Sequence, residues 1–186
     1  MIPIDFENTI RGAFPVWEYQ QTNALLTGID IDSQWKISEH WQHRLTLSYV
    51  NGRDISNDDA LIDMPPLNFN NRIQFTKKEW YDLTLELQSE VVFTQKQYPD
   101  NNFTTNIIVD GVFTPVVVDI STPPSGYHLL HFNSEVKFQT SKNTYATLGF
   151  SAYNLLNTSY RDYLNKQRFY ADEMGRNFQI QLKINY

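Results

Sequence analysis

The last ten residues of the chain, Asn177–Tyr186, read NFQIQLKINY and alternate between polar and apolar side chains at every position. The apolar positions are Phe178, Ile180, Leu182, Ile184 and Tyr186. Successive side chains of a β-strand point to opposite faces of the sheet. The stretch therefore predicts a strand that has one apolar face and one polar face.

The same alternation recurs seven more times upstream. It covers residues 2–10, 15–37, 44–49, 67–75, 82–93, 130–138 and 147–152. With these registers, no Asp, Glu, Lys or Arg falls on an apolar face. We therefore expect an all-β fold made of about eight long antiparallel strands.

The expected connections differ in length in a regular way. Short ones fall at residues 38–42, 76–80 and 140–144, and long ones run over 51–66 and 97–126. Long and short connections should therefore lie at opposite ends of the sheet. This organisation is typical of transmembrane β-barrels, which have short periplasmic turns, long outer loops, an apolar outer band and a polar interior. A soluble barrel or sandwich also alternates, but the polar faces here are too hydrophilic for a small soluble core.

Composition excludes several classes of protein. The chain has 186 residues, enough for one domain of good size. Its formal net charge of -6 and the lack of any Lys/Arg cluster argue against a nucleic-acid partner. It contains no cysteine, so disulfides and cysteine-based zinc sites are excluded. The first residues show neither the basic segment nor the apolar segment of a signal peptide.

No motif for catalysis is present. The sequence lacks GxSxG, HExxH and P-loop patterns, so we expect neither enzymatic activity nor a bound cofactor. His128 and His131 are three residues apart, which places them on opposite faces of a strand, and His40 and His43 have the same spacing. Neither pair is expected to ligate a metal ion. The acidic stretches at 57–59 and 171–173 are interpreted as solvated loop charge.

The segment before the last strand carries four recognisable motifs. They are Asn-Leu-Leu-Asn at 154–157, Tyr-Arg-Asp-Tyr-Leu at 160–164, Phe-Tyr at 169–170 and Gly-Arg-Asn at 175–177. Together with the final strand, they resemble the C-terminal end of TonB-dependent outer-membrane receptors. Leu156 stands where that family usually has Phe, and Tyr186 replaces the commoner terminal Phe. Weaker resemblance extends upstream over VWEYQQTNALLTGIDID at 16–32 and MPPLNFNNRI at 64–73.

This resemblance implies that the whole chain, residues 1–186, is the C-terminal portion of a receptor barrel. The family's barrel has 22 strands and a plugged lumen, so eight strands make roughly its last third, and the plug domain is absent here. We therefore expect an open, curved, twisted sheet that is polar inside and apolar outside. The strands at 1–10 and 176–186 should form its unpaired edges.

The resemblance also implies a function. Such a receptor lies in the cell outer membrane of a Gram-negative bacterium and imports a scarce nutrient, such as an iron–siderophore complex, cobalamin, a metal or a glycan. Its expected partners are outer-membrane lipid, the plug domain and the rest of the barrel, the TonB complex through the missing N-terminal part, and the barrel assembly machinery. Two alternatives remain: a stand-alone eight-stranded outer-membrane barrel serving as anchor or adhesin, and a soluble ligand-binding barrel.

Two groups of residues are candidate sites. The first group either contacts cargo or orders the loop before the last strand, and comprises Tyr160, Arg161, Asp162, Arg168, Tyr170, Asp172 and Arg176. The second is the C-terminal assembly signal, given by the five apolar residues of the final strand from Phe178 to Tyr186. The loops at 53–64 and 98–125 are better candidates for ligand choice. The sequence of the loop at 98–125 predicts a hairpin that turns at Asp110 and Gly111.

Overall fold

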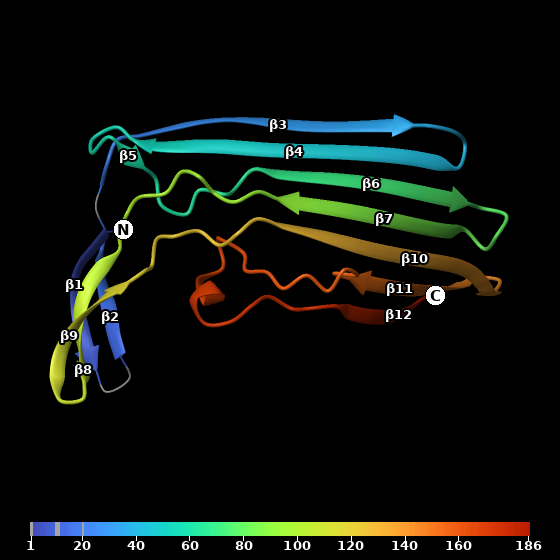
Figure 1. Cartoon of the computed structure of the whole chain (residues 1–186). Coiled ribbons are helices and arrows are strands. Elements are labelled where there is room, and N and C mark those ends of the chain that lie inside the picture. The colour runs from blue at the N-terminus through green and yellow to red at the C-terminus, as the bar shows by residue number, and fades with distance from the viewer. Residues whose placement is uncertain (1, 10–11, 20) are drawn as a thin grey trace.

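A computed structural model describes residues 2–9, 12–19 and 21–186, and Figure 1 shows these residues as an antiparallel all-β fold. The long strands of the main sheet are β3 (Ala24–Lys36), β4 (Trp41–Asp54), β6 (Asn68–Lys77), β7 (Leu83–Val92), β10 (Tyr127–Ser141), β11 (Thr144–Tyr153) and β12 (Asn177–Asn185). The short β5 (Asp59–Ala60) pairs with the end of β4. Among the described residues, no helix is long and apolar enough to cross a membrane.

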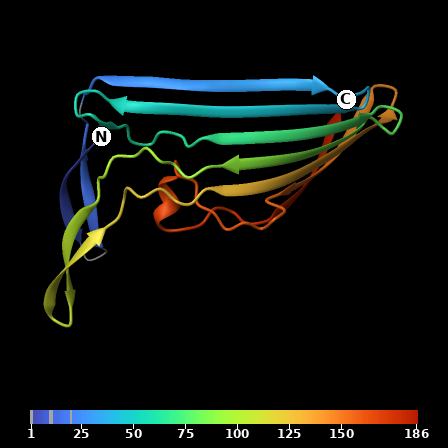
Figure 2. The same cartoon turned by 45° about the horizontal axis from the view of Figure 1, so that its top comes forward.

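Two small sheets and one short helix complete the structure. One small sheet pairs β1 (Ile2–Thr9) with β2 (Gly12–Glu18), and the other pairs β8 (Phe103–Val109) with β9 (Val112–Val118). Both project from the same end of the main sheet in Figures 1 and 2. A single turn of 3-10 helix, η1 (Lys166–Phe169), lies in the loop before β12.

The main sheet is open, as expected. Its strand order is β12-β11-β10-β7-β6-β4-β3, so β12 and β3 are its edges and are not paired with each other. With β5 the sheet has eight strands. The chain therefore forms a portion of a β-barrel wall rather than a closed barrel.

The strand register joins the apolar residues of all seven long strands into one face. A single row across the sheet runs through Trp35, His43, Ile73, Leu87, Phe132, Ala152 and Phe178. Many of these apolar side chains are exposed, including Ile73, Leu87 and Phe178. This face has polar interruptions: a His43 ring nitrogen lies 2.6 Å from Asn71 Oδ1, and a His128 ring nitrogen lies 2.8 Å from Ser89 Oγ. These two histidines thus have hydrogen-bonding partners on the same face.

The polar residues form an equally continuous opposite face. One row runs through Gln34, Arg44, Arg72, Gln88 and His131, and the next through Asp32, Thr46, Asn70 and Glu90. One hollow is lined by these two rows, and a second is lined mostly by other residues of the same face, including Glu86, Glu135 and Lys183. The sequence-based assignment of one polar and one apolar face is therefore confirmed for the main sheet.

The connections also follow the expected pattern. Short turns join β3 to β4, β6 to β7 and β10 to β11 at one end, and the C-terminus lies at that end in Figure 1. Long connections join the strands at the other end. The predicted hairpin within 98–125 is confirmed as β8–β9, with Asp110 at φ 51° and Gly111 at φ 81°. Positive φ at both central residues is the geometry of a type I′ turn, which Asp-Gly favours.

Two expectations about the first strands are wrong. Residues 15–37 do not form one long strand, because β2 ends at Glu18 and β3 begins at Ala24. The segment 1–10 is not an edge of the main sheet, because β1 pairs only with β2; Met1, Ile10 and Gln20 lie outside the described residues. The break occurs where polar residues close the end of the β3–β4 pair: Thr22 Oγ1 donates to Asp54 Oδ1 at 2.5 Å.

Candidate functional site

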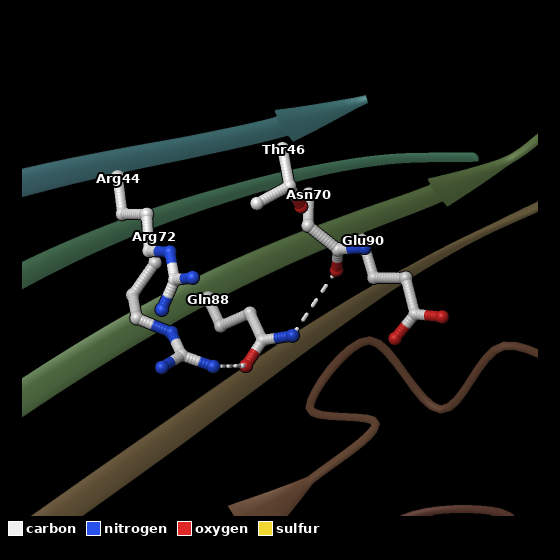
Figure 3. A pocket seen from close by; sticks show the side chains of 6 residues that line it. All are labelled: Arg44, Thr46, Asn70, Arg72, Gln88 and Glu90. Carbon is white, nitrogen blue, oxygen red and sulfur yellow. Dashed lines mark hydrogen bonds between the residues drawn. The ribbon is translucent and has the colours of Figure 1, made fainter. Parts of the chain in front are cut away.

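A hollow of about 270 Å³ lies on the polar face, at the centre of the main sheet. Three neighbouring strands, β4, β6 and β7, supply its lining, and Figure 3 shows the six side chains. They are Arg44, Thr46, Asn70, Arg72, Gln88 and Glu90. These residues occupy two adjacent rows of the sheet, which is why strand pairing alone brings them together.

Hydrogen bonds hold the side chains of this hollow in place. Gln88 donates through Nε2 to Asn70 Oδ1 at 3.1 Å and accepts from Arg72 Nη2 at 3.1 Å (Figure 3). Arg44 pairs with Asp32, with Nε 2.9 Å from Oδ1, and Arg72 Nε lies 3.6 Å from a Glu86 oxygen. Each guanidinium of this wall therefore has an acidic neighbour.

The wall can hold water or polar protein surface. A second hollow, of about 290 Å³, lies further along the same face and includes Glu86, Glu135 and Lys183 in its lining. Within the described residues, no group of three or more His, Asp or Glu side chains could hold a metal ion. His128 and His131 lie on opposite faces, as expected, and His40 lies in the β3–β4 turn beside the Thr76 carbonyl.

The loop of residues 154–176 contains the first group of candidate residues. Asp172 accepts hydrogen bonds from Ser159 Oγ at 2.5 Å and from Arg161 Nε at 2.6 Å. These two hydrogen bonds hold the pKa of the Asp172 carboxyl below its usual value, and the bond from Ser159 has the larger effect. Arg161 also donates to the carbonyl oxygen of Arg168 at 2.8 Å. The structure thus brings Arg161, Arg168 and Asp172 together.

Asp162 and Tyr160 connect the same loop to the main sheet. Tyr127, the first residue of β10, donates its hydroxyl to Asp162 Oδ2 at 2.8 Å, and its ring lies 4.4 Å from the Tyr160 ring, centroid to centroid. Partial burial raises the pKa of the Tyr160 hydroxyl. These contacts fix the loop against the long-loop end of β10.

Arg168 is the most buried of the candidate residues, with only 6% of its surface exposed. Its guanidinium lies 4.6 Å from the Tyr163 ring centroid and 4.5 Å from that of Phe169, and it donates to the Tyr163 carbonyl. The other two candidates face solvent: Tyr170 is 77% exposed and Arg176 is exposed. Arg161 and Asp172 are exposed too, but they are joined to each other by the ion pair described above.

Asn154 organises the base of this loop, a role that its place in the sequence motif did not indicate. It is 2% exposed and has a positive φ of 49°. Its side-chain amide donates to the Thr158 carbonyl and accepts from the Thr158 N–H, both at 2.9 Å. Its backbone N–H donates to His131 Nδ1 at 3.3 Å. The signal in the sequence was the residue type, because Asn adopts positive φ more readily than most residues.

The apolar residues proposed as an assembly signal all lie on β12, an edge of the main sheet. Phe178, Ile180, Leu182 and Ile184 register with the apolar face of β11 and are exposed. Tyr186 follows the end of β12 and is fully exposed. The structure places these residues on one apolar ridge at the sheet edge.

Comparison with known proteins identifies the fold. No family model matches this sequence, and no curated protein is similar enough in sequence to count as a match. Among solved structures, the chain is similar to the "Copper transporter OprC", with a TM-score of 0.70 and 19% sequence identity. The similarity covers 98% of this chain and 26% of that chain, so this chain spans about a quarter of that transporter's length. The chain therefore has the fold of part of a β-barrel wall.

Proposed function

We propose that the chain forms the last strands of the barrel of a TonB-dependent receptor, in the outer membrane of a Gram-negative bacterium. In this proposal the receptor imports a scarce nutrient. The observation that carries the proposal is the continuous exposed apolar face, which lies opposite a charged face across seven paired strands. An apolar outer face and a polar inner face are what a transmembrane barrel wall requires.

Each part of the structure has a role in this proposal. The apolar face contacts outer-membrane lipid, and the polar face, with its hollow around Arg72, faces the plug domain and water. The long loops lie at the cell surface, where cargo arrives. The TonB complex acts on a plug that another part of the receptor supplies, and the barrel assembly machinery inserts the strands. The chain itself has a transport role rather than an enzymatic one.

Two features of the main sheet argue against the alternatives of a stand-alone outer-membrane barrel and a soluble ligand-binding barrel. A stand-alone eight-stranded barrel requires its first and last strands to pair, but β3 and β12 are separate edges of the main sheet. A soluble ligand-binding barrel requires an apolar interior, but the hollows of the main sheet are lined mostly by polar side chains. The soluble barrel also leaves the exposed apolar face without a role.

A matched pair of substitutions tests the membrane placement. Ile73 lies on the exposed apolar face of β6, and its neighbour Gln74 lies on the polar face opposite Glu86. Ile73→Lys places a charge in lipid, at a cost of about 2–4 kcal/mol near the bilayer centre. Gln74→Lys places the same charge beside a carboxylate. We expect Ile73→Lys to lower the outer-membrane level of the protein severalfold, measured by immunoblot of fractionated membranes, and Gln74→Lys to leave it unchanged.

Import itself is tested by deleting the gene in the source bacterium. Uptake of labelled iron–siderophore complex, cobalamin, copper and oligosaccharide is then measured with and without a functional TonB system. The proposal expects uptake of one of these cargoes to fall to the background level in both mutants. Equal losses for the two lysine variants above would contradict the membrane placement, and normal uptake of every cargo would contradict the import role.

A further inference from the structure

A polar pair of residues interrupts the apolar face at the middle of the main sheet. The hairpin of β6 and β7 presents four cross-strand pairs on that face (Figure 1). Three of them are wholly apolar: Phe75 with Leu85, Ile73 with Leu87, and Phe69 with Val91. The fourth, Asn71 with Ser89, lies between the pairs of Ile73 and Phe69. Two polar side chains thus stand side by side on a face that the proposed function assigns to lipid.

This polar pair lies near the middle of the membrane in the proposed placement. Asn71 is six residues before the end of β6 at Lys77, and Ser89 is six residues after the start of β7 at Leu83. At about 3.3 Å per residue and a tilt of about 40°, six residues rise about 15 Å, and the apolar band is about 25 Å tall. Trp80, in the turn between the two strands, is exposed, as aromatic residues at a membrane interface are. Both polar residues are equally far from this turn, so they lie at a similar depth.

Each residue of the pair has a hydrogen-bonding partner on its outer side. A ring nitrogen of His43 on β4 lies 2.6 Å from Asn71 Oδ1, and one of His128 on β10 lies 2.8 Å from Ser89 Oγ. Within the part of the chain that the structure describes, the Asn71 amide has no second partner. An amide carries an acceptor oxygen and a donor nitrogen, so one of these two atoms is left without a bond. Hydrocarbon offers it no partner, and an unpaired polar group in an apolar medium costs free energy.

A second copy of the same wall supplies the missing partner. Consider a dimer whose two-fold axis runs along the membrane normal and passes between β6 and β7. Such an axis places each residue opposite the residue at the same depth on the other side of the axis. Asn71 then faces Ser89 of the partner subunit, whose hydroxyl both donates and accepts. By symmetry the same bond forms twice, and the exposed apolar residues Ile73 and Leu87 pack beside it. A lipid headgroup does not reach this depth.

We propose that the β6–β7 hairpin forms the centre of a homodimer interface within the outer membrane, where Asn71 bonds with Ser89 of the partner subunit. This inference rests on the membrane placement in the proposed function, because an unpaired amide is costly only where water is absent. It goes beyond that function, because it gives the protein an oligomeric state and assigns the surface through which two copies meet.

Cysteine cross-linking in outer membranes of the source bacterium tests this contact. The chain contains no cysteine, so within it an introduced cysteine reports only on its own position. Ser89→Cys is compared with Ser33→Cys, since Ser33 lies on the same face and in the same cross-strand row, three strands away on β3.

The spacing of the strands sets the expected result. Strands are about 4.8 Å apart, so the two copies of residue 89 lie about 5 Å apart along the interface, and those of residue 33 lie about 24 Å apart. With a short bismaleimide, we expect Ser89→Cys to give a product of twice the mass, at about ten times the yield of Ser33→Cys. An immunoblot of fractionated membranes confirms that both variants reach the outer membrane equally.

Removal of the hydroxyl gives a second readout. The protein is purified in mild detergent, and light scattering measures its mass over a range of concentrations. Ser89→Ala removes both symmetry-related bonds, so the dissociation constant of the dimer should rise about tenfold. Ser33→Ala is the same substitution in the same row and should leave the dissociation constant unchanged.

Three results would overturn the dimer. They are a yield for Ser89→Cys no higher than for Ser33→Cys, a cross-linked product that contains a different protein, and equal dissociation constants for Ser89→Ala and the native protein. None of these measurements involves cargo. If Ile73→Lys is depleted from the outer membrane as expected and the cross-link is absent, the dimer is wrong and the membrane placement stands.

Discussion

At the scale of single residues, Asn154 is the side chain on which the loop of residues 154–176 depends most. Replacing it with Ala removes two buried hydrogen bonds to Thr158 and leaves a residue with a side chain at φ 49°. We expect a loss of about 2–3 kcal/mol in the local opening free energy of the loop. Hydrogen exchange of the loop amides measures this loss.

Asn154→Gly separates the two causes. Glycine tolerates positive φ, so this variant loses the hydrogen bonds but not the backbone fit. Hydrogen exchange of the loop amides should be slower in Asn154→Gly than in Asn154→Ala, and faster than in the native protein. If the two variants exchange equally fast, backbone strain contributes nothing at this position.

A second residue-scale prediction concerns pH. The hydrogen bonds from Ser159 and Arg161 lower the pKa of Asp172 in the folded loop relative to the unfolded value of about 3.9. A carboxyl whose folded pKa is lowered stabilises the fold above the unfolded pKa, and this stabilisation disappears as pH falls through the folded pKa. Loop protection should therefore be constant above about pH 5 and decline below about pH 4. Hydrogen exchange at a series of pH values measures this decline in loop protection. The decline should be smaller in Asp172→Asn.

At the scale of elements, the β8–β9 hairpin depends on its turn. Gly111 has a φ of 81°, and a Cβ added there would meet no atom within 4 Å. Gly111→Ala should therefore destabilise the hairpin through backbone strain alone, by about 1 kcal/mol. Because β8 and β9 form a separate sheet, hydrogen exchange should rise in the hairpin and stay unchanged in β7. Gly111→Asn is the matched control. It should destabilise the hairpin less than Gly111→Ala does, since Asn tolerates positive φ.

The hairpin and the first strands show why sequence predicted some elements better than others. Asp110-Gly111 is a local signal, since two adjacent residues define the turn, and the hairpin was predicted correctly. The break between β2 and β3 was missed because Trp17 and Tyr19 have the same odd-numbered spacing as Leu25 and Ile29, across the polar residues 20–23 that interrupt the pattern. The hydrogen bond from Thr22 to Asp54, a residue 32 positions away in sequence, lies just before the start of β3. A contact between such distant residues leaves no trace in local periodicity.

At the scale of the whole molecule, the final strand is expected to direct assembly. Deleting Tyr186 removes the exposed aromatic residue that ends the apolar ridge of β12. We expect a lower outer-membrane level of the protein, measured by surface labelling, with Tyr186→Phe close to normal because the aromatic ring is retained. An unchanged level after the deletion would mean that the ridge only contacts lipid. The total amount of each variant in whole-cell lysate serves as the control for synthesis.

The candidate sites were predicted to different degrees. Sequence motifs singled out Arg161, Asp162 and Asp172, which the structure brings into one ordered loop. Sequence reasoning also named the loop at 53–64. Arg53 and residues 58–60 of this loop line a hollow of about 280 Å³ at the long-loop end of the sheet. It did not foresee that Lys96 and Gln97 complete that hollow, because a buried Gln95 places them there through contacts with Met64 and Pro65.

The sequence by itself determined the strand class, the separation of an apolar face from a polar face, and the opposite placement of short turns and long loops. These features follow from alternation and turn chemistry, which are local properties of the chain. Only the tertiary structure decided which strands form the main sheet, where the first long strand breaks, and which loop residues meet around each hollow. Those features depend on which strands pair and on hydrogen bonds between residues far apart in sequence. Side-chain periodicity restricts the register to pairings that keep the apolar residues on one face, but it does not specify which strands pair.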